Sequence, residues 1–477
     1  MTLRALVVGC LTASLLAACG SRTTTRLDST ALRDPETCRE CHQTQYEQWA
    51  GSMHAYASDD PVFLAMNARA QRETAGAVGK ACANCHAPVA VRDGLTTDGL
   101  NVATLPQKEK GVTCYFCHAV ESIAGTHDNP LVLAADDSLF GPFGDAIAGA
   151  PHVAKTSAIF DDTTPDSAAM CGSCHDIVNT HGAHVERTFT EWQGTVFSKP
   201  GVGLSCPACH MEGSDGIAAA GSTRTRRLHR HDLPAVDLAL TTWPDADGQR
   251  TRAQALLDAT VQSTICWNQV SKQIEVTLDN VGAGHGWPSG ATPDRRAWVE
   301  VQAFAGGQSI YSSGGDAAQP LESSPDPDLW LVRDCLKDPG GAETHLFWQA
   351  ASETDNQLPG SASSNVNDPA SFAGHRRRSF PSTGAGLAQT PDRITVAVHL
   401  QAIGADVLDD LVASKDLDAA VAAKVARYDL AGAALEWTTA TAKLEPDATA
   451  GFMKACVTGG RYSPMTTPAE THARCAP

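Results

Sequence analysis

The sequence predicts an α-rich N-terminal domain with little regular structure beyond helices, followed by a mostly β, sandwich-like C-terminal domain. Two observations carry this prediction. Ten of the 16 cysteines lie in five identical C-x-x-C-H frames, all between residues 38 and 210. After about residue 240 the frames stop, and runs that alternate apolar and polar residues begin. The length of 477 residues is enough for two or three domains.

The composition is that of a globular chain. Hydrophobic residues make up 42% and charged residues 19%, which does not indicate disorder. Outside the N-terminus, no apolar run of the sequence reaches membrane-spanning length. The formal charge of -18 argues against nucleic-acid binding and against a polybasic membrane anchor. The sequence carries no Rossmann or P-loop fingerprint, so no bound nucleotide is expected.

Residues 1–18 predict an export signal. Arg4 supplies a positive charge, and the apolar stretch 6–16 that follows is too short for a stable membrane-spanning helix. The sequence Leu-Ala-Ala-Cys19 resembles a bacterial lipobox, so we expect a lipid on Cys19 and an outer-membrane lipoprotein that faces the periplasm or the cell surface. The alternative is a plain signal peptide with a chance cysteine. Residues 19–32 are expected to form a polar tether.

The five cysteine frames have one chemical meaning, because C-x-x-C-H is the attachment signature of c-type haem. Two thiols three residues apart lie on one side of a helical turn and can each bond a haem vinyl group. The next histidine is then placed to ligate the iron. A zinc ribbon does not require a histidine after each cysteine pair. We therefore expect five covalent haems, on Cys38, Cys41 and His42; Cys82, Cys85 and His86; Cys114, Cys117 and His118; Cys171, Cys174 and His175; and Cys206, Cys209 and His210.

The motifs are dense, with about 35 residues of chain for each haem. So little chain cannot enclose five macrocycles in a conventional core. The haems must themselves form much of the core, with neighbouring rings close together. We therefore expect residues 33–240 to form a pentahaem domain that acts as a multi-centre electron path.

Each iron has a second axial position, and a second histidine there is typical of an electron-transfer centre, whereas an open position can bind a substrate. We predict His54, His152, His231 and His285 as distal ligands. His285 lies in the Gly-rich stretch NVGAGHGWPSG, which leaves room for a flat ring. The fifth distal position stays open between four candidates, which are His229, His127, His181 and His184. A structural role is expected for His345, His375, His399 and His472.

Several stretches around the motifs resemble the multihaem cytochromes c of the cytochrome c-552/4 family. They are YEQWAGSMHA, GVTCYFCHAV, GPFGDA…PH before CGSCHD, and ERTFTEWQGT…CPACHME, and together they cover about residues 33–240. That family includes a tetrahaem carrier of ammonia oxidation and is akin to hydroxylamine oxidoreductases and pentahaem nitrite reductases. The resemblance implies His54, His152 and His231 as distal ligands. The chain departs from it in having five motifs, and it lacks the C-x-x-C-K motif of most pentahaem nitrite reductases.

A sandwich-like domain is expected over residues 255–450. Period-2 runs predict strands at 274–278, 297–304, 394–400 and 434–444, and apolar residues three to four apart predict one helix over 406–430. The Ser-, Gly- and Pro-rich segments 313–328 and 352–392 are expected to be surface loops. The basic run HRRRSF (375–380) is then a solvated loop, and the alternative is a docking patch or a partner of haem propionates.

Four cysteines follow the last motif, which suggests two disulfides in an exported chain, with three possible connectivities. We favour Cys266–Cys335 and Cys456–Cys475, the second of which would staple a C-terminal tail over residues 451–477.

Three functions remain open. The leading hypothesis is a pentahaem electron carrier between redox partner proteins, without catalytic residues of its own. The acidic charge favours docking to a basic partner. The second hypothesis is a reductase or oxidase of a small nitrogen or sulfur compound at one five-coordinate haem. The third is a subunit of a larger complex or of a conductive assembly.

Overall fold

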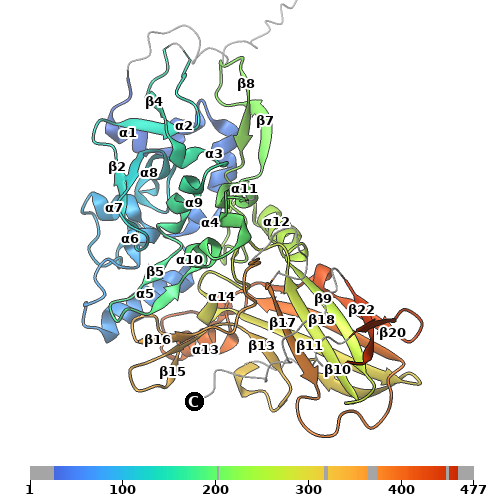
Figure 1. The fold of residues 1–477 in the computed structure, drawn as a ribbon. Helices are drawn as coiled ribbons and strands as arrows, with labels where there is room; N and C mark the ends of the chain where they lie inside the picture. Colours follow the sequence, from blue (N-terminus) through green and yellow to red (C-terminus); the bar gives the residue numbers. More distant parts are fainter. Residues whose placement is uncertain are drawn as a thin grey trace, which may run out of the picture.

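A computed structural model describes residues 26–147, 149–200, 203–315, 321–363, 373–446 and 451–459. Figure 1 shows two regions, with short helices and small sheets in the upper part and larger sheets in the lower part. No helix in these described ranges is long and apolar enough to cross a membrane. The export signal, Cys19, His472 and Cys475 lie outside the described residues.

Short helices carry the five cysteine motifs. Aspartate or threonine side chains begin several of these helices, for example Asp34 before the second helix and Thr113 before the eighth. A capping oxygen accepts the backbone N–H groups that have no partner in a first turn, which lets helices of one turn exist in this region. The helices are α1 (Ser29–Arg33), α2 (Pro35–Arg39), α3 (Gln43–Ala50), α4 (Met53–Tyr56), α5 (Pro61–Glu73), α6 (Ala83–His86), α7 (Pro88–Arg92), α8 (Cys114–His118), α9 (Pro165–Gly172), α10 (Thr188–Gln193) and α11 (Cys206–His210).

The same region also contains two-stranded sheets, which the sequence analysis did not predict. Three are antiparallel, and the pair β3–β4 is parallel. The pairs are β1 (Val120–Ile123) with β2 (Leu131–Leu133), β3 (Ser138–Gly141) with β4 (Val153–Thr156), β5 (Ile177–Val178) with β6 (His184–Glu186), and β7 (Gly213–Ile217) with β8 (Thr225–His229).

The C-terminal region begins with α12 (Ala246–Asp258) and contains two larger sheets. Both sheets contribute to one hydrophobic core, which includes Val276, Leu278, Val299 and Val398. One sheet has the order β17 (His375–Phe380), β10 (Gln273–Asn280), β9 (Val261–Asn268), β22 (Met453–Thr458) and β21 (Lys443–Pro446). The other has the order β12 (Gln308–Ser313), β11 (Arg296–Ala305), β18 (Arg393–Gln401) and β19 (Arg427–Asp429), with β13 (Trp330–Val332) on β11 and β20 (Leu435–Thr438) on β18.

The predicted fold class is wrong, because the structure is 28% helical and 26% strand and mixes the two throughout. Small sheets accompany the helices of the first region. The second region adds helices and a three-stranded sheet of β14 (Cys335–Lys337), β15 (Glu343–Thr344) and β16 (Ser352–Thr354).

The single helix expected over 406–430 is also wrong. The segment forms α13 (Ala405–Ala413), α14 (Ala419–Ala422) and then strand β19. Lys415 has a positive φ of 64°, which ends the first helix, and the Asp418 carboxylate then caps the second. The predicted strand 434–444 is likewise divided into β20 and β21.

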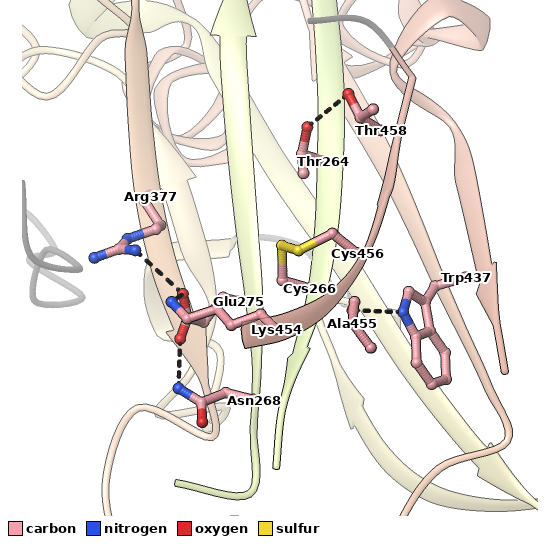
Figure 2. Close-up of a disulfide and its surroundings, with 10 residues drawn as sticks. All are labelled: Thr264, Cys266, Asn268, Glu275, Arg377, Trp437, Lys454, Ala455, Cys456 and Thr458. Carbon is pink, nitrogen blue, oxygen red and sulfur yellow. Dashed lines mark hydrogen bonds and ion pairs between the residues drawn. A yellow bond between two sulfur atoms is a disulfide. The ribbon is translucent and has the colours of Figure 1, made fainter. Parts of the chain in front are cut away.

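Two further expectations for the second region are corrected in Figure 2. Cys266 of β9 is bonded to Cys456 of the neighbouring strand β22, so neither Cys266–Cys335 nor Cys456–Cys475 forms. The run 375–380 is strand β17 rather than a solvated loop, and Arg377 pairs there with the buried carboxylate of Glu275. Strand geometry explains how a basic run can be ordered, because successive side chains point to opposite faces of the sheet.

Candidate haem-binding site

One continuous cavity of about 2010 Å³ connects the five cysteine motifs. Ordinary ligand pockets measure about 300–1,000 Å³, so this cavity has room for more than one large cofactor. Its walls include both cysteines and the histidine of every motif, as well as His54, His152, His231 and His285. The fold therefore brings all nineteen residues that were predicted to hold haem to one space.

Four of the five motif histidines are oriented by a backbone carbonyl. The Nδ1 atoms of His42, His86, His118 and His210 lie 2.7, 3.1, 2.7 and 2.9 Å from the carbonyl oxygens of Ala218, Ala57, Phe140 and Pro234. A carbonyl oxygen can only accept, so Nδ1 donates its proton and Nε2 keeps its lone pair. This is the tautomer that an iron ligand bonded through Nε2 requires.

The fifth motif histidine has a different partner. His175 Nδ1 lies 2.9 Å from Oε1 of Glu186, which belongs to strand β6 of the hairpin that follows the motif. Burial by itself lowers the pKa of His175, but the hydrogen bond and the charge of Glu186 outweigh it and raise this pKa to about 9.

Four of the motif histidines face a second histidine ring. Two imidazoles that share one metal through bonds of about 2 Å have ring centres about 6 Å apart. In the structure, four pairs have ring-centre separations of 6.3, 6.2, 6.3 and 6.5 Å, and these are His42 with His152, His175 with His54, His118 with His231, and His210 with His285. The geometry thus matches each predicted distal histidine to one motif.

Local contacts hold the distal histidines in place. The carbonyl of His54, on α4, accepts the backbone N–H of Val112, and Gly111 passes so close that a Cβ there would lie 2.6 Å from the same oxygen. His231 Nδ1 meets the carbonyl of His229 at 2.9 Å. Burial lowers the pKa of His54 and of His231 to about 4, so both rings are neutral at pH 7 and each has a nitrogen lone pair to offer a metal.

The His285 loop depends on a residue from the first region. Glu191, on α10, accepts hydrogen bonds through Oε2 from the backbone N–H of Gly286 at 3.1 Å and from the Ser289 hydroxyl at 2.7 Å. His285 Nδ1 lies 2.7 Å from the Gly286 carbonyl. The second region therefore supplies one predicted ligand, and a buried carboxyl of the first region positions it.

His86 has no such partner. The ring that packs on it is Phe63 of α5, with ring centres 4.1 Å apart and planes 4° apart. Among the described residues, no histidine forms a ring pair with His86, and no lysine lines the cavity. Among the four candidates for the fifth distal position, the rings of His229, His127 and His184 lie beside the carboxylates of Asp162, Asp128 and Asp176. The contact of His181 with Asn179 is made by its backbone N–H, and His181 and His229 both line the cavity.

Contacts between thiols reveal which motifs are neighbours. The side chain of Cys38 interacts with that of Cys114, Cys85 with Cys174, and Cys171 with Cys206. The first motif therefore adjoins the third, and the fourth adjoins both the second and the fifth. Linear spacing contains no signal for this order, and it contains none for the roles of Glu186 and Glu191 either.

Comparisons with known proteins agree with this site. Residues 37–119 match the family model described as cytochrome c554 and c-prime. The fold is similar to that of a penta-heme cytochrome c552 from Thermochromatium tepidum, with a TM-score of 0.57 and 19% sequence identity over 86% of this chain and 99% of that one. No curated protein matches the sequence. The five attachment motifs, the family match and the shared fold together support a multihaem c-type cytochrome, whereas membership of the cytochrome c-552/4 family remains a prediction.

Proposed function

We propose that this chain carries five covalently bound c-type haems and transfers electrons between redox partner proteins. The observation that carries the proposal is the set of four histidine ring pairs at 6.2–6.5 Å around one cavity. Two histidines that held one iron would favour electron transfer over substrate binding, because neither position would be left for a substrate. When bound, the haems supply the Fe(III)/Fe(II) couple. The chain supplies the ligands, a buried environment and the spacing between motifs.

Spectroscopy of the exported, matured protein tests this proposal. The pyridine haemochrome assay should give five haems per chain. Electron paramagnetic resonance (EPR) of the oxidised protein should be dominated by low-spin signals, and a redox titration should place most midpoints below zero against hydrogen, as bis-histidine ligation favours. Fewer than four low-spin centres per chain, or midpoints mostly well above zero, would contradict the proposal.

A second candidate function rests on His86, which lacks a histidine opposite it among the described residues. An iron held there by one imidazole would leave an axial position for a small nitrogen or sulfur compound, which is the alternative of a reductase or oxidase. The absence of lysine from the described cavity wall argues against the lysine ligation of most pentahaem nitrite reductases.

The same EPR experiment separates the two functions. A high-spin signal from about one haem in five that changes on addition of nitrite or hydroxylamine supports the enzyme. A spectrum that neither compound alters supports the carrier. His152→Ala provides the matched control, because it should create one high-spin centre at the His42 motif and so calibrate the signal of one open iron.

We further propose that the chain is exported, anchored to the outer membrane by lipid on Cys19, and docked to a basic redox partner. The lipobox-like sequence supports the anchor, and the charge of -18 supports the partner. Cys19→Ala should release the protein from the membrane fraction and abolish incorporation of labelled palmitate. If the partner is basic, the rate of electron transfer to it should fall as salt rises.

A further inference from the structure

One of the five motif histidines differs from the others in the chemistry of its partner. Four rings donate from Nδ1 to a neutral backbone carbonyl, whereas His175 donates to the carboxylate of Glu186 at 2.9 Å. The Glu186 side chain is only 15% exposed, so solvent weakens this bond little.

A short β-hairpin next to the motif brings Glu186 to the His175 ring. The motif is followed at once by strand β5, and β6 returns antiparallel to it, with Ile177 paired to Glu186. The neighbouring acid, Asp176, is engaged elsewhere, since its carboxylate accepts the backbone N–H and the hydroxyl of Thr190 at the start of α10. Glu186 therefore supplies the carboxylate that accepts the hydrogen bond from the His175 ring.

The motif of His175 also occupies a junction. Its Cys174 interacts with Cys85 of the second motif, and its Cys171 with Cys206 of the fifth. Electrons that pass between the second and fifth motifs along these contacts must cross the fourth.

A carboxylate that accepts the Nδ1 proton makes the imidazole a stronger electron donor through Nε2. A stronger donor stabilises Fe(III) relative to Fe(II), which lowers the reduction potential. We propose that Glu186 is a positioning residue that tunes this junction, so that the haem on Cys171 and Cys174 has the lowest potential of the four bis-histidine centres and is reduced last. This inference rests on the proposed electron-transfer function.

Three variants test the proposal in the full, matured protein. Glu186→Gln keeps a hydrogen-bond acceptor but removes the charge. Glu186→Asp keeps the charge but is one methylene shorter, so the carboxylate no longer reaches Nδ1. Glu212→Gln is the matched control, because Glu212 is an exposed carboxyl two residues after the His210 ligand, with no hydrogen bond to a ligand ring among the described contacts.

We expect both Glu186 variants to shift the lowest midpoint upward, by about a tenfold change in the oxidised-to-reduced ratio at fixed potential, which equals about 59 mV for one electron. One low-spin EPR signal should change its g-values in both variants. Glu212→Gln should change the ratio less than about twofold and leave the g-values as they were.

Three results would overturn the inference. One is a Glu186→Gln protein with all midpoints and g-values unchanged. Another is a shift that affects a centre other than the lowest. The third is an equal shift of the midpoint in Glu212→Gln, which would show that any nearby carboxylate has the same effect as the hydrogen bond from His175. Failure of the proposed function looks different, because the unaltered protein would then lack haem or low-spin centres. If Glu186→Gln does not mature, Glu186→Asp carries the test alone.

Discussion

The two regions of this molecule build their interiors in opposite ways. In the first region the buried apolar residues form small separate clusters, such as the group of Phe63, Ala87, Ala90 and Val102. In the second region residues from both large sheets join in one continuous core, with Leu278 and Trp330 fully buried. Between the small clusters of the first region lies the cavity that carries the cysteine motifs.

The second region thus encloses most of its core between its own two sheets, although Leu257 and Trp287 of that core also line the cavity, whereas the first region depends on a cofactor to fill its interior. Helices of four or five residues are marginal in water and depend on packing. In the first region such helices, including α6, α8 and α11, end on motif histidines that line the cavity. Covalently attached macrocycles would therefore be part of the fold as well as the site of chemistry.

Removal of the haem attachment sites should separate the two regions most strongly. Replacing all ten motif cysteines by alanine prevents haem attachment, and the first region should then lose most of its protection from amide hydrogen exchange. The second region should keep most of its protection, because the greater part of its core is enclosed by its own two sheets. Cys38→Ala with Cys41→Ala removes one attachment site and serves as the graded control. Equal loss of protection in both regions would show that they fold as one unit.

A core truncation in the second region should have the next largest effect. Leu278 on β10 is fully buried, so Leu278→Ala should lower the free energy of unfolding of this region by about 2–5 kcal/mol. Val270 is 72% exposed, and Val270→Ala should change it by less than about 0.5 kcal/mol. Denaturant unfolding followed by far-UV circular dichroism measures both. If Leu278→Ala weakens the second region alone, the haem absorption spectrum should stay unchanged at low denaturant. Equal changes in the free energy of unfolding for the two variants would contradict the prediction.

The smallest expected effect concerns the seam between the regions, where Asp294 lines the cavity. Burial raises the pKa of Asp294 from 3.8 to about 7, although Arg296 and Arg295 oppose the shift. The folded state therefore holds a proton that the unfolded chain releases at lower pH. The contribution of Asp294 to stability is present below about pH 4 and falls as the pH rises to about 7.

Asp294→Asn should remove this loss, so that the variant gains stability relative to the unaltered protein between about pH 4 and pH 7. Denaturation midpoints measured across this range test the sign. Asp215→Asn, at an exposed carboxyl of β7, is the control and should follow the unaltered protein. A difference between Asp294→Asn and the unaltered protein that does not grow with pH would refute the assignment.

Much of the site could be predicted from the sequence, and the parts that could not share a cause. The attachment motifs are local, since one helical turn places two thiols and a histidine together, as in α8 and α11. The strands at 274–278, 297–304 and 394–400 were found from alternation and lie within β10, β11 and β18. Alternation did not reveal β17, because its arginines were expected to be solvated and the partner of Arg377, Glu275, lies about a hundred residues away.

The cofactor chemistry and the candidate ligands could therefore be predicted from the amino-acid sequence, because they depend on residues a few positions apart. The three-dimensional arrangement was needed to learn which distal histidine faces which motif, which motifs adjoin, and that Glu186 rather than a carbonyl holds His175. The disulfide between Cys266 and Cys456, 190 residues apart, likewise became evident only from the three-dimensional arrangement. Such pairings follow from strand order and packing across the whole chain, and no short window of sequence contains them.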